Sequence, residues 1–184
     1  MDTEGILRQW CRLGVLFNVP PSDTTPDIEQ LLVDTAVTLP ANPRLLSVTV
    51  AWLGLYERLV CRHRLAGFAA CIGSPEVSAC LGLILDYARA RTGSDHFNAV
   101  IKLCRPCETP QPLFLVDRKS EALASLAKAG TSSLALRWNY WCSEIEPKED
   151  AVRPADWVFR QNPSLKARAL FGGSLKSSIL ETLT

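Results

Sequence analysis

The stretch from Asn42 to Phe68 reads NPRLLSVTVAWLGLYERLVCRHRLAGF, and it changes from apolar to basic along its length. Asn42 is a good N-cap and Pro43 suits the first helical position, so a helix is expected to begin here. The residues that follow are apolar on nearly every side, which is typical of a helix inside a core or a membrane. Glu57 arrives before the roughly 20 apolar residues that a membrane span needs. The stretch therefore predicts a buried central helix over about 42–66.

The composition bounds the class of protein. The chain has 184 residues, of which 47% are hydrophobic and 21% are charged, and these shares are ordinary for a globular protein. This length predicts one domain, or one domain with an appendage. The formal net charge is +1, so the molecule as a whole has no strong attraction to nucleic acid or to a membrane surface. The N-terminus MDTEGILRQW is acidic and lacks the apolar core of a signal peptide, so we expect a cytoplasmic protein.

Further helices are expected on both sides of the central stretch. Four of the expected starts share one chemistry, a capping residue followed by proline: Thr25-Pro26, Asn42-Pro43, Ser74-Pro75 and Asn162-Pro163. Two short segments, 113–117 and 134–140, have patterns typical of strands, although a continuous helix through the second stays open. The expected fold class is mainly α: a multi-helix bundle around the central helix, with a small two-stranded β element.

Charge and proline content predict how the chain is divided. Residues 144–154 are charged and flanked by proline, which is typical of a linker. We therefore expect a helical core domain over 1–143, this linker over 144–154, and a C-terminal helical appendage over 155–184.

The sequence has seven cysteines, an odd number, and we expect free thiols in a reducing compartment. Cys104 and Cys107 form a Cys-x-x-Cys pair, a spacing that can hold zinc or exchange disulfides. A structural zinc site needs four ligands and only one such pair is present, so incidental thiols are the simpler interpretation. Zinc bound by Cys104 and Cys107 remains the alternative, and otherwise no cofactor is expected.

Cys61 is a candidate nucleophile, because the neighbouring Arg62 and Arg64 favour the reactive thiolate. Its other neighbour, His63, cannot act as its base within one helix, since residues so close in sequence point to different faces. The simpler interpretation places Cys61 in the core and His63 on the surface. A cysteine-dependent enzyme or zinc-binding protein using Cys61, Cys104 or Cys107 is therefore the alternative function.

Three arginines gather in the basic half of the central stretch. Arg58, Arg62 and Arg64 are candidates for an anion-binding or partner-binding patch. The competing interpretation is a solvated helix end, whose arginines complement the negative end of the helix dipole. Three arginines are few for a nucleic-acid surface, which favours the solvated helix end over the patch.

Residues 157–183, WVFRQNPSLKARALFGGSLKSSILETL, resemble the lead-in and first helix of winged-helix domains in bacterial regulator-like proteins. The run 165–173, followed by 175–176 and 179–183, carries the resemblance. In that family a recognition helix enters the major groove, and a wing follows. Neither is present before Thr184, so DNA contact is expected to be indirect, or to use residues that are not in this chain. The resemblance implies the N-terminal part, or a truncated relative, of a bacterial transcriptional regulator.

The end of the chain carries one apolar stripe. Leu175, Ile179 and Leu183 are spaced i, i+4 and i+8, so they share a helix face. A short isolated helix is marginal in water, so we expect self-association through this stripe, with the domain's own body or a longer chain as the alternatives. Since no phosphate loop, nucleophile elbow or zinc-protease motif occurs, the sequence favours a non-enzymatic binding or regulatory module. Its expected partner is a protein or a second copy, with no membrane contact.

Overall fold

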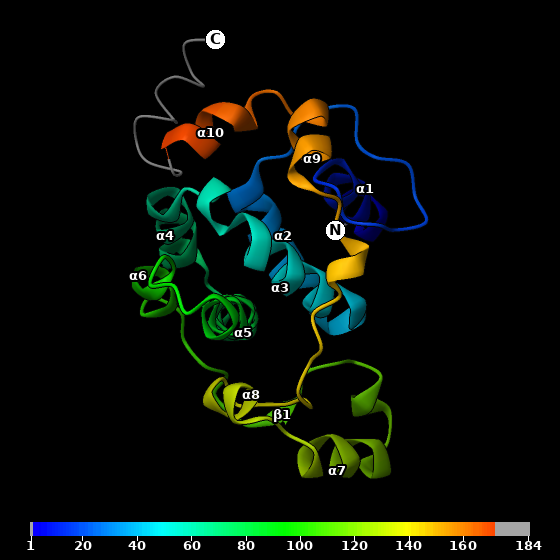
Figure 1. Cartoon of the computed structure of the whole chain (residues 1–184). Coiled ribbons are helices and arrows are strands. Elements are labelled where there is room, and N and C mark those ends of the chain that lie inside the picture. The colour runs from blue at the N-terminus through cyan, green and yellow to red at the C-terminus, as the bar shows by residue number, and fades with distance from the viewer. Residues whose placement is uncertain (1, 172–184) are drawn as a thin grey trace.

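Helices α2 (Ile28–Thr38), α3 (Arg44–Tyr56) and α5 (Pro75–Thr92) lie at the centre of the structure, a computed structural model that describes residues 2–171. Helix α5, which is viewed end-on in Figure 1, packs against both α2 and α3. It begins at the expected Ser-Pro start, and ends at Gly93, whose φ of 66° suits glycine. These three helices supply much of the hydrophobic core.

Trp52 of α3 lies at the centre of that core and is fully buried. Its indole nitrogen donates a hydrogen bond to the carbonyl of Leu13 at 3.0 Å. Its ring meets the edge of Trp10, on α1 (Thr3–Arg12), with the ring centroids 5.6 Å apart. The indole nitrogen of Trp10 in turn donates to Thr35 of α2 at 2.8 Å. The two tryptophans therefore join three helices without leaving a buried N–H unpaired.

The expected helix over 42–66 is buried in its first half but is divided in two. After α3 the chain forms a 3-10 turn, η2 (Glu57–Leu59), and then a separate helix, α4 (Arg62–Cys71). Between them the amide of Cys61 donates to the buried carboxylate of Glu29 at 2.7 Å. The chain turns at this point because a tertiary contact, which the local sequence does not show, satisfies the first amide of α4.

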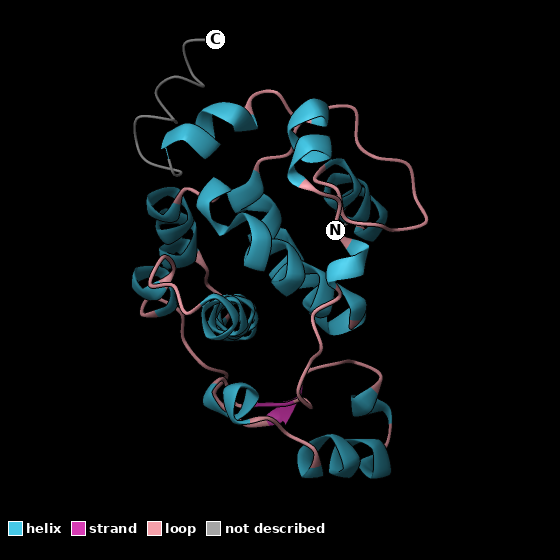
Figure 2. Ribbon diagram, in the orientation of Figure 1, coloured by secondary structure: helices cyan, strands magenta, loops and turns pink. Residues whose placement is uncertain are grey.

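A small lobe follows α6 (Asn98–Ile101) and contains the two-stranded sheet (Figure 2). Strand β1 (Gln111–Pro112) pairs in parallel with β2 (Tyr140–Trp141). Three helical elements complete the lobe: η3 (Asp117–Lys119), α7 (Glu121–Ala129) and α8 (Ser133–Arg137).

The small β element is confirmed, but its strands lie beside the predicted segments. Residues 113–117 follow β1, and most of 134–140 is the helix α8 and the turn after it. The side chain of Ser132 explains the helix, because its hydroxyl caps α8 by accepting from the amide of Ala135 at 3.2 Å. The alternation of apolar residues there is thus a feature of a short capped helix.

The chain then returns to the helical body through η4 (Glu149–Ala151), α9 (Ala155–Gln161) and α10 (Leu165–Phe171). Val152 forms an antiparallel bridge with Val15, next to α1. Val158 and Leu165 are buried in the same hydrophobic core as the central helices. The described part of the segment 155–184 therefore packs on the core, beside α1 and the end of α3 (Figure 1).

The structure confirms the mainly α fold class. One more 3-10 turn, η1 (Leu39–Ala41), links α2 to α3. Across residues 2–171 we find no helix with both the length and the apolar character needed to traverse a lipid bilayer.

Candidate functional site

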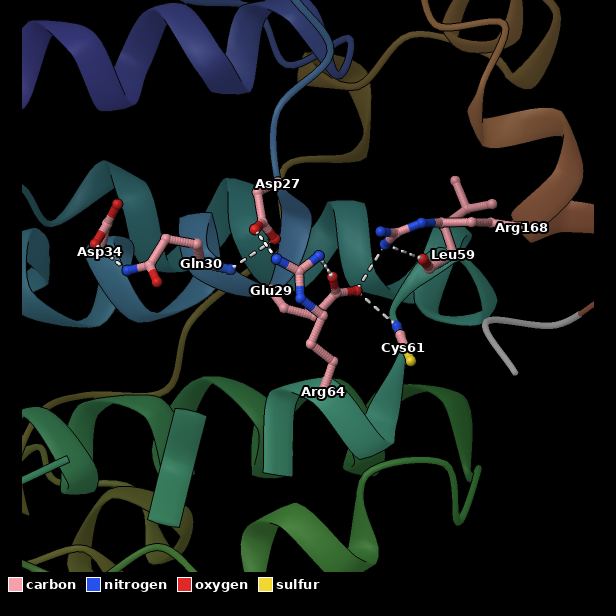
Figure 3. Close-up of polar contacts among 8 residues, drawn as sticks. All are labelled: Asp27, Glu29, Gln30, Asp34, Leu59, Cys61, Arg64 and Arg168. Atoms are coloured by element: carbon pink, nitrogen blue, oxygen red, sulfur yellow. Dashed lines mark hydrogen bonds and ion pairs between the residues drawn. The ribbon is translucent and has the colours of Figure 1, made fainter. Parts of the chain in front are cut away.

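A buried carboxylate, that of Glu29, is the centre of a polar network between α2, the η2–α4 turn and α10 (Figure 3). Its Oε1 accepts one hydrogen bond from the amide of Cys61 and one from Nη1 of Arg168, both at 2.7 Å. Its Oε2 lies 3.5 Å from Nη1 of Arg64. Because the Glu29 side chain is fully buried, these groups replace the water that would otherwise surround its charge.

Local structure places each member of this network. Glu29 is in the first turn of α2, where a negative charge suits the helix dipole, and Asp27 caps that helix by accepting from the amide of Gln30 at 3.2 Å. Cys61 is the N-cap residue of α4, so the Glu29 carboxylate also lies at the positive end of a second helix. Arg168 comes from α10, and its side chain reaches inward until only 5% of the residue is exposed.

Burial dominates the electrostatics of Glu29. Desolvation raises the pKa of its carboxyl group above the ordinary value, while the charge of Arg168 and the Cys61 amide act in the opposite direction. The guanidinium of Arg168 makes a second contact, donating from Nη1 to the carbonyl of Leu59 at 3.2 Å. The Glu29–Arg168 pair is thus an ion pair inside the protein, and loss of either partner would leave a buried charge less well compensated.

Arg64 connects this network to the surface. Its Nη2 forms an ion pair with Asp27, while Nη1 approaches Glu29. The guanidinium also lies over the ring of Phe68, 5.5 Å from the ring centroid, which is within the limit of about 6 Å for a cation–π contact. Glu29 therefore has two cations beside it, one buried on α10 and one half-exposed on α4.

An open cleft of about 690 Å³ adjoins the network, because Leu59 belongs to both. Its walls come from the end of α3, η2, the end of α5, α9 and α10. Leu55 is half-exposed in the cleft, and Arg58 lines it without an ion pair to any described residue. Of the other charged lining groups, Glu57 accepts a hydrogen bond from Thr92 at 3.2 Å. The cleft thus combines apolar surface with charges of both signs, and its other cation, Arg91, is paired with Glu149.

A second hollow, of about 630 Å³, continues from the first between α9 and α10. The two share Phe159 and Ala169. Leu170, which is 80% exposed, lines the second hollow together with two cations and one carboxylate: Arg160, Lys166 and Asp156. Helix α10 is therefore a wall of both hollows, and its inner face carries Arg168.

The structure separates the three arginines predicted to form one patch. Arg58 lines the cleft, and Arg64 is paired with carboxylates. Arg62 is exposed at the start of α4 and lines neither hollow. Of the predicted patch, Arg58 is the residue that lies where a partner could be held in a concave surface.

The predicted cysteine sites are inside the protein. Cys104 and Cys107 are both buried, and burial raises the pKa of the Cys104 thiol to about 12. The sulfur of Cys107 accepts a weak hydrogen bond from the side-chain amide of Gln111 at 3.7 Å. Within residues 2–171 no group of three or more His, Cys, Asp or Glu side chains is arranged to hold a metal ion. Zinc at Cys104 and Cys107 stays a prediction.

Cys61 is also buried, as the simpler interpretation expected, and His63 is exposed. The role of Cys61 in the network comes from its backbone amide. The self-association residues Leu175, Ile179 and Leu183 lie outside the described residues.

Two members of the network, Glu29 and Arg168, were not identified as site residues from the sequence. Glu29 lies in line with Leu32 and Ala36, at i, i+3 and i+7, so it shares the apolar face of α2. A carboxylate on a core-facing stripe is a signal of a buried charge, and hence of a buried cation elsewhere. Nothing in the sequence indicates that its partner is Arg168, which is 139 residues away.

In comparisons with known proteins, no family model matches the chain, and neither a curated protein nor a solved structure matches it.

Proposed function

We propose that the protein is a non-enzymatic binding module that holds a segment of a partner protein in the cleft between α3, α9 and α10. The observation that carries this proposal is the exposure of Leu55 (53%) and Leu170 (80%) on a concave surface. Exposed apolar residues that gather in a hollow rimmed by charges are typical of protein interaction sites.

The charges of the cleft indicate the chemistry of the partner. Arg58, Arg160 and Lys166 make no ion pair with any described residue, and they outnumber the two lining carboxylates that are likewise without an ion pair to a described residue, Glu57 and Asp156. A segment with apolar side chains flanked by carboxylates would fill the hollows and pair these cations. An apolar lining suits a protein segment better than a phosphate backbone, which needs polar and cationic contacts.

The raised pKa of the Cys104 thiol argues against this candidate nucleophile and so supports a binding role. Burial raises the pKa of Cys104 to about 12. A thiol in this state is a poor nucleophile at neutral pH, because the thiolate is the reactive form.

The resemblance to bacterial winged-helix regulators extends the proposal. We infer that the module works in the cytoplasm as part of a regulator, and that it influences DNA through its protein partner. The resembling segment begins with α9 and α10, the two helices that wall the cleft, so a partner bound there would touch the part of the chain nearest to a DNA-reading domain in such proteins.

Site-specific photocrosslinking in native cells tests the proposal. A photoreactive residue placed at Leu55 or Leu170 is expected to crosslink to a defined protein, through a segment that contains both apolar and acidic residues. The same group at Leu103, which is 45% exposed and does not line either hollow, is the matched control. Crosslinking no stronger at Leu55 and Leu170 than at Leu103 would overturn the proposed function.

A further inference from the structure

Helix α10 is attached to the body of the protein by few side chains. Of those described between Leu165 and Leu170, only Leu165 and Arg168 are buried, at 2% and 5% exposure. A helix of seven residues is too short to be stable alone, so its docking decides whether it forms. Among the described residues of α10, the docking therefore depends on the side chains of Leu165 and Arg168.

The body provides a receiving site for the guanidinium of Arg168. Glu29 Oε1 and the carbonyl oxygen of Leu59 accept from the same nitrogen, Nη1, at 2.7 and 3.2 Å. The two acceptors come from α2 and η2, which belong to the central body (Figure 3). An anion and a carbonyl oxygen that converge on one point form a site for a hydrogen-bonding cation.

Glu29 would keep two other partners if Arg168 left. The amide of Cys61 donates to it at 2.7 Å, and Nη1 of Arg64 lies 3.5 Å away. Arg64 is half-exposed and also pairs with Asp27, so it can move closer to Glu29 without leaving the surface. The Glu29 carboxylate thus has polar partners both when α10 is docked and when α10 is released. Helix α10 can therefore alternate between two positions without leaving a buried charge alone.

The position of α10 affects the cleft. Ala169, the residue after Arg168, lines both hollows, and Leu170 lines the second. Movement of α10 would therefore displace one wall of the cleft and widen its opening.

We propose that α10 is a releasable strap, fastened to the body through Arg168 in the Glu29–Leu59 site, and that its release opens the cleft to a partner. The second half of this statement rests on the proposed function of the cleft, while the first half does not.

Hydrogen exchange of the full chain, followed by mass spectrometry, tests the strap. In Arg168→Met, which keeps an unbranched apolar side chain, exchange of the α10 amides is expected to become about tenfold faster or more, while α2 and α5 keep their protection. Arg160→Met is the matched control, because Arg160 is exposed on the neighbouring helix and makes no ion pair with a described residue. The double variant Glu29→Gln, Arg168→Met removes both charges and is expected to show the same local effect if the single variant folds poorly.

Chemical rescue tests the receiving site itself. Ethylguanidinium added to Arg168→Ala is expected to restore part of the protection of α10, whereas ethylammonium, which lacks the planar fork, is not. Rescue by both cations alike would overturn the assignment of a guanidinium site. Unchanged exchange in α10, or equal loss of protection in α10, α2 and α5 of both variants, would overturn the strap.

Photocrosslinking at Leu55 then separates the two halves of the proposal. Release in Arg168→Met is expected to increase crosslinking to the partner. Faster exchange in α10 with unchanged crosslinking would overturn the link to the cleft while supporting the strap. Absence of crosslinking in every variant would contradict the proposed function, and the exchange data would still decide the strap.

Discussion

Trp138 lies so close to Gly82 that α5 has no room for a side chain at this position. A Cβ atom built on Gly82 would lie 2.2 Å from Cη2 of Trp138, well below van der Waals contact. The indole is held there because its Nε1 donates to Oδ2 of Asp86, one turn further along α5, at 3.2 Å. Glycine in the middle of a helix is unfavourable by itself, and here it permits the small lobe to dock on α5.

Gly82→Ala is therefore expected to destabilise the protein by about 1–3 kcal/mol, the usual range for overpacking a core. Both the Gly82 backbone and the Trp138 ring are buried, so the clash cannot be relieved by a simple rotation into solvent. Urea denaturation gives the free energy of unfolding. Gly67→Ala is the control, because a Cβ at this exposed helical position meets nothing within 4 Å. A loss of stability that is no larger for Gly82→Ala than for Gly67→Ala would contradict the packing described.

Asp86 connects the same lobe to α5 by charge. Its fully buried carboxylate accepts from Arg137 at 2.9 Å and pairs with Arg89 at 2.5 Å, besides the bond from Trp138. Asp86→Ala is expected to cost about 1–3 kcal/mol, since it leaves a buried indole N–H without its acceptor. Arg89 and Arg137 are partly exposed, so water can solvate them when Asp86 is removed, and the loss of their ion pairs adds less to the cost in stability. A double-mutant cycle with Arg137→Met measures the pairwise energy, and a coupling energy near zero would show that Arg137 does not stabilise the lobe.

Trp52→Ala is expected to cost about 3–5 kcal/mol, the range for removal of a large buried aromatic side chain. The indole is fully buried, donates to the Leu13 carbonyl, and contacts Trp10. Thermal and urea unfolding both report the loss. Leu55→Ala, on the same helix but 53% exposed, serves as the control and should change stability little. Similar effects of the two substitutions would contradict the position of Trp52 at the centre of the core.

The fold class could be predicted from the sequence because it depends on local signals. Ser74 and Ser120 cap their helices through the side chain, as such residues commonly do. The apolar run of α3 also indicates its burial. The end of that helix could not be predicted, since the turn at Cys61 depends on the Glu29 carboxylate, 32 residues earlier.

The candidate site was predicted less completely, for the same physical reason. Arg58 was identified, and it lines the cleft. Arg64 was identified as a partner-binding residue, but its charge is already paired with Asp27 and Glu29. The pairing of Glu29 with Arg168 joins distant parts of the chain, and periodicity carries no information about such pairs.

The buried thiols predict how stability depends on alkaline pH. Burial raises the pKa of Cys80 and Cys104 from an ordinary value of 9.0 to about 12, and that of Cys142 to about 11. Between these values the native state keeps protons that the unfolded state loses, so the free energy of unfolding falls as pH rises above about 9. The contribution is fully present below pH 9 and is lost as pH rises toward the folded values. Each group can contribute up to about 1.4 kcal/mol per pH unit within its own window.

Urea denaturation at a series of alkaline pH values checks this dependence, with Cys104→Ala as the comparison. That variant lacks one of the three thiols whose pKa burial raises to about 11 or 12, so its stability is expected to fall less steeply with pH than that of the parent protein. Alkylation at neutral pH provides an independent readout. Cys71, the exposed cysteine among the seven described, is expected to react with iodoacetamide first, and the buried thiols only on unfolding. Fast alkylation of Cys61 or Cys107 in the folded protein would instead favour the cysteine-dependent enzyme, and equal pH slopes for the two proteins would show that the Cys104 thiol is not desolvated.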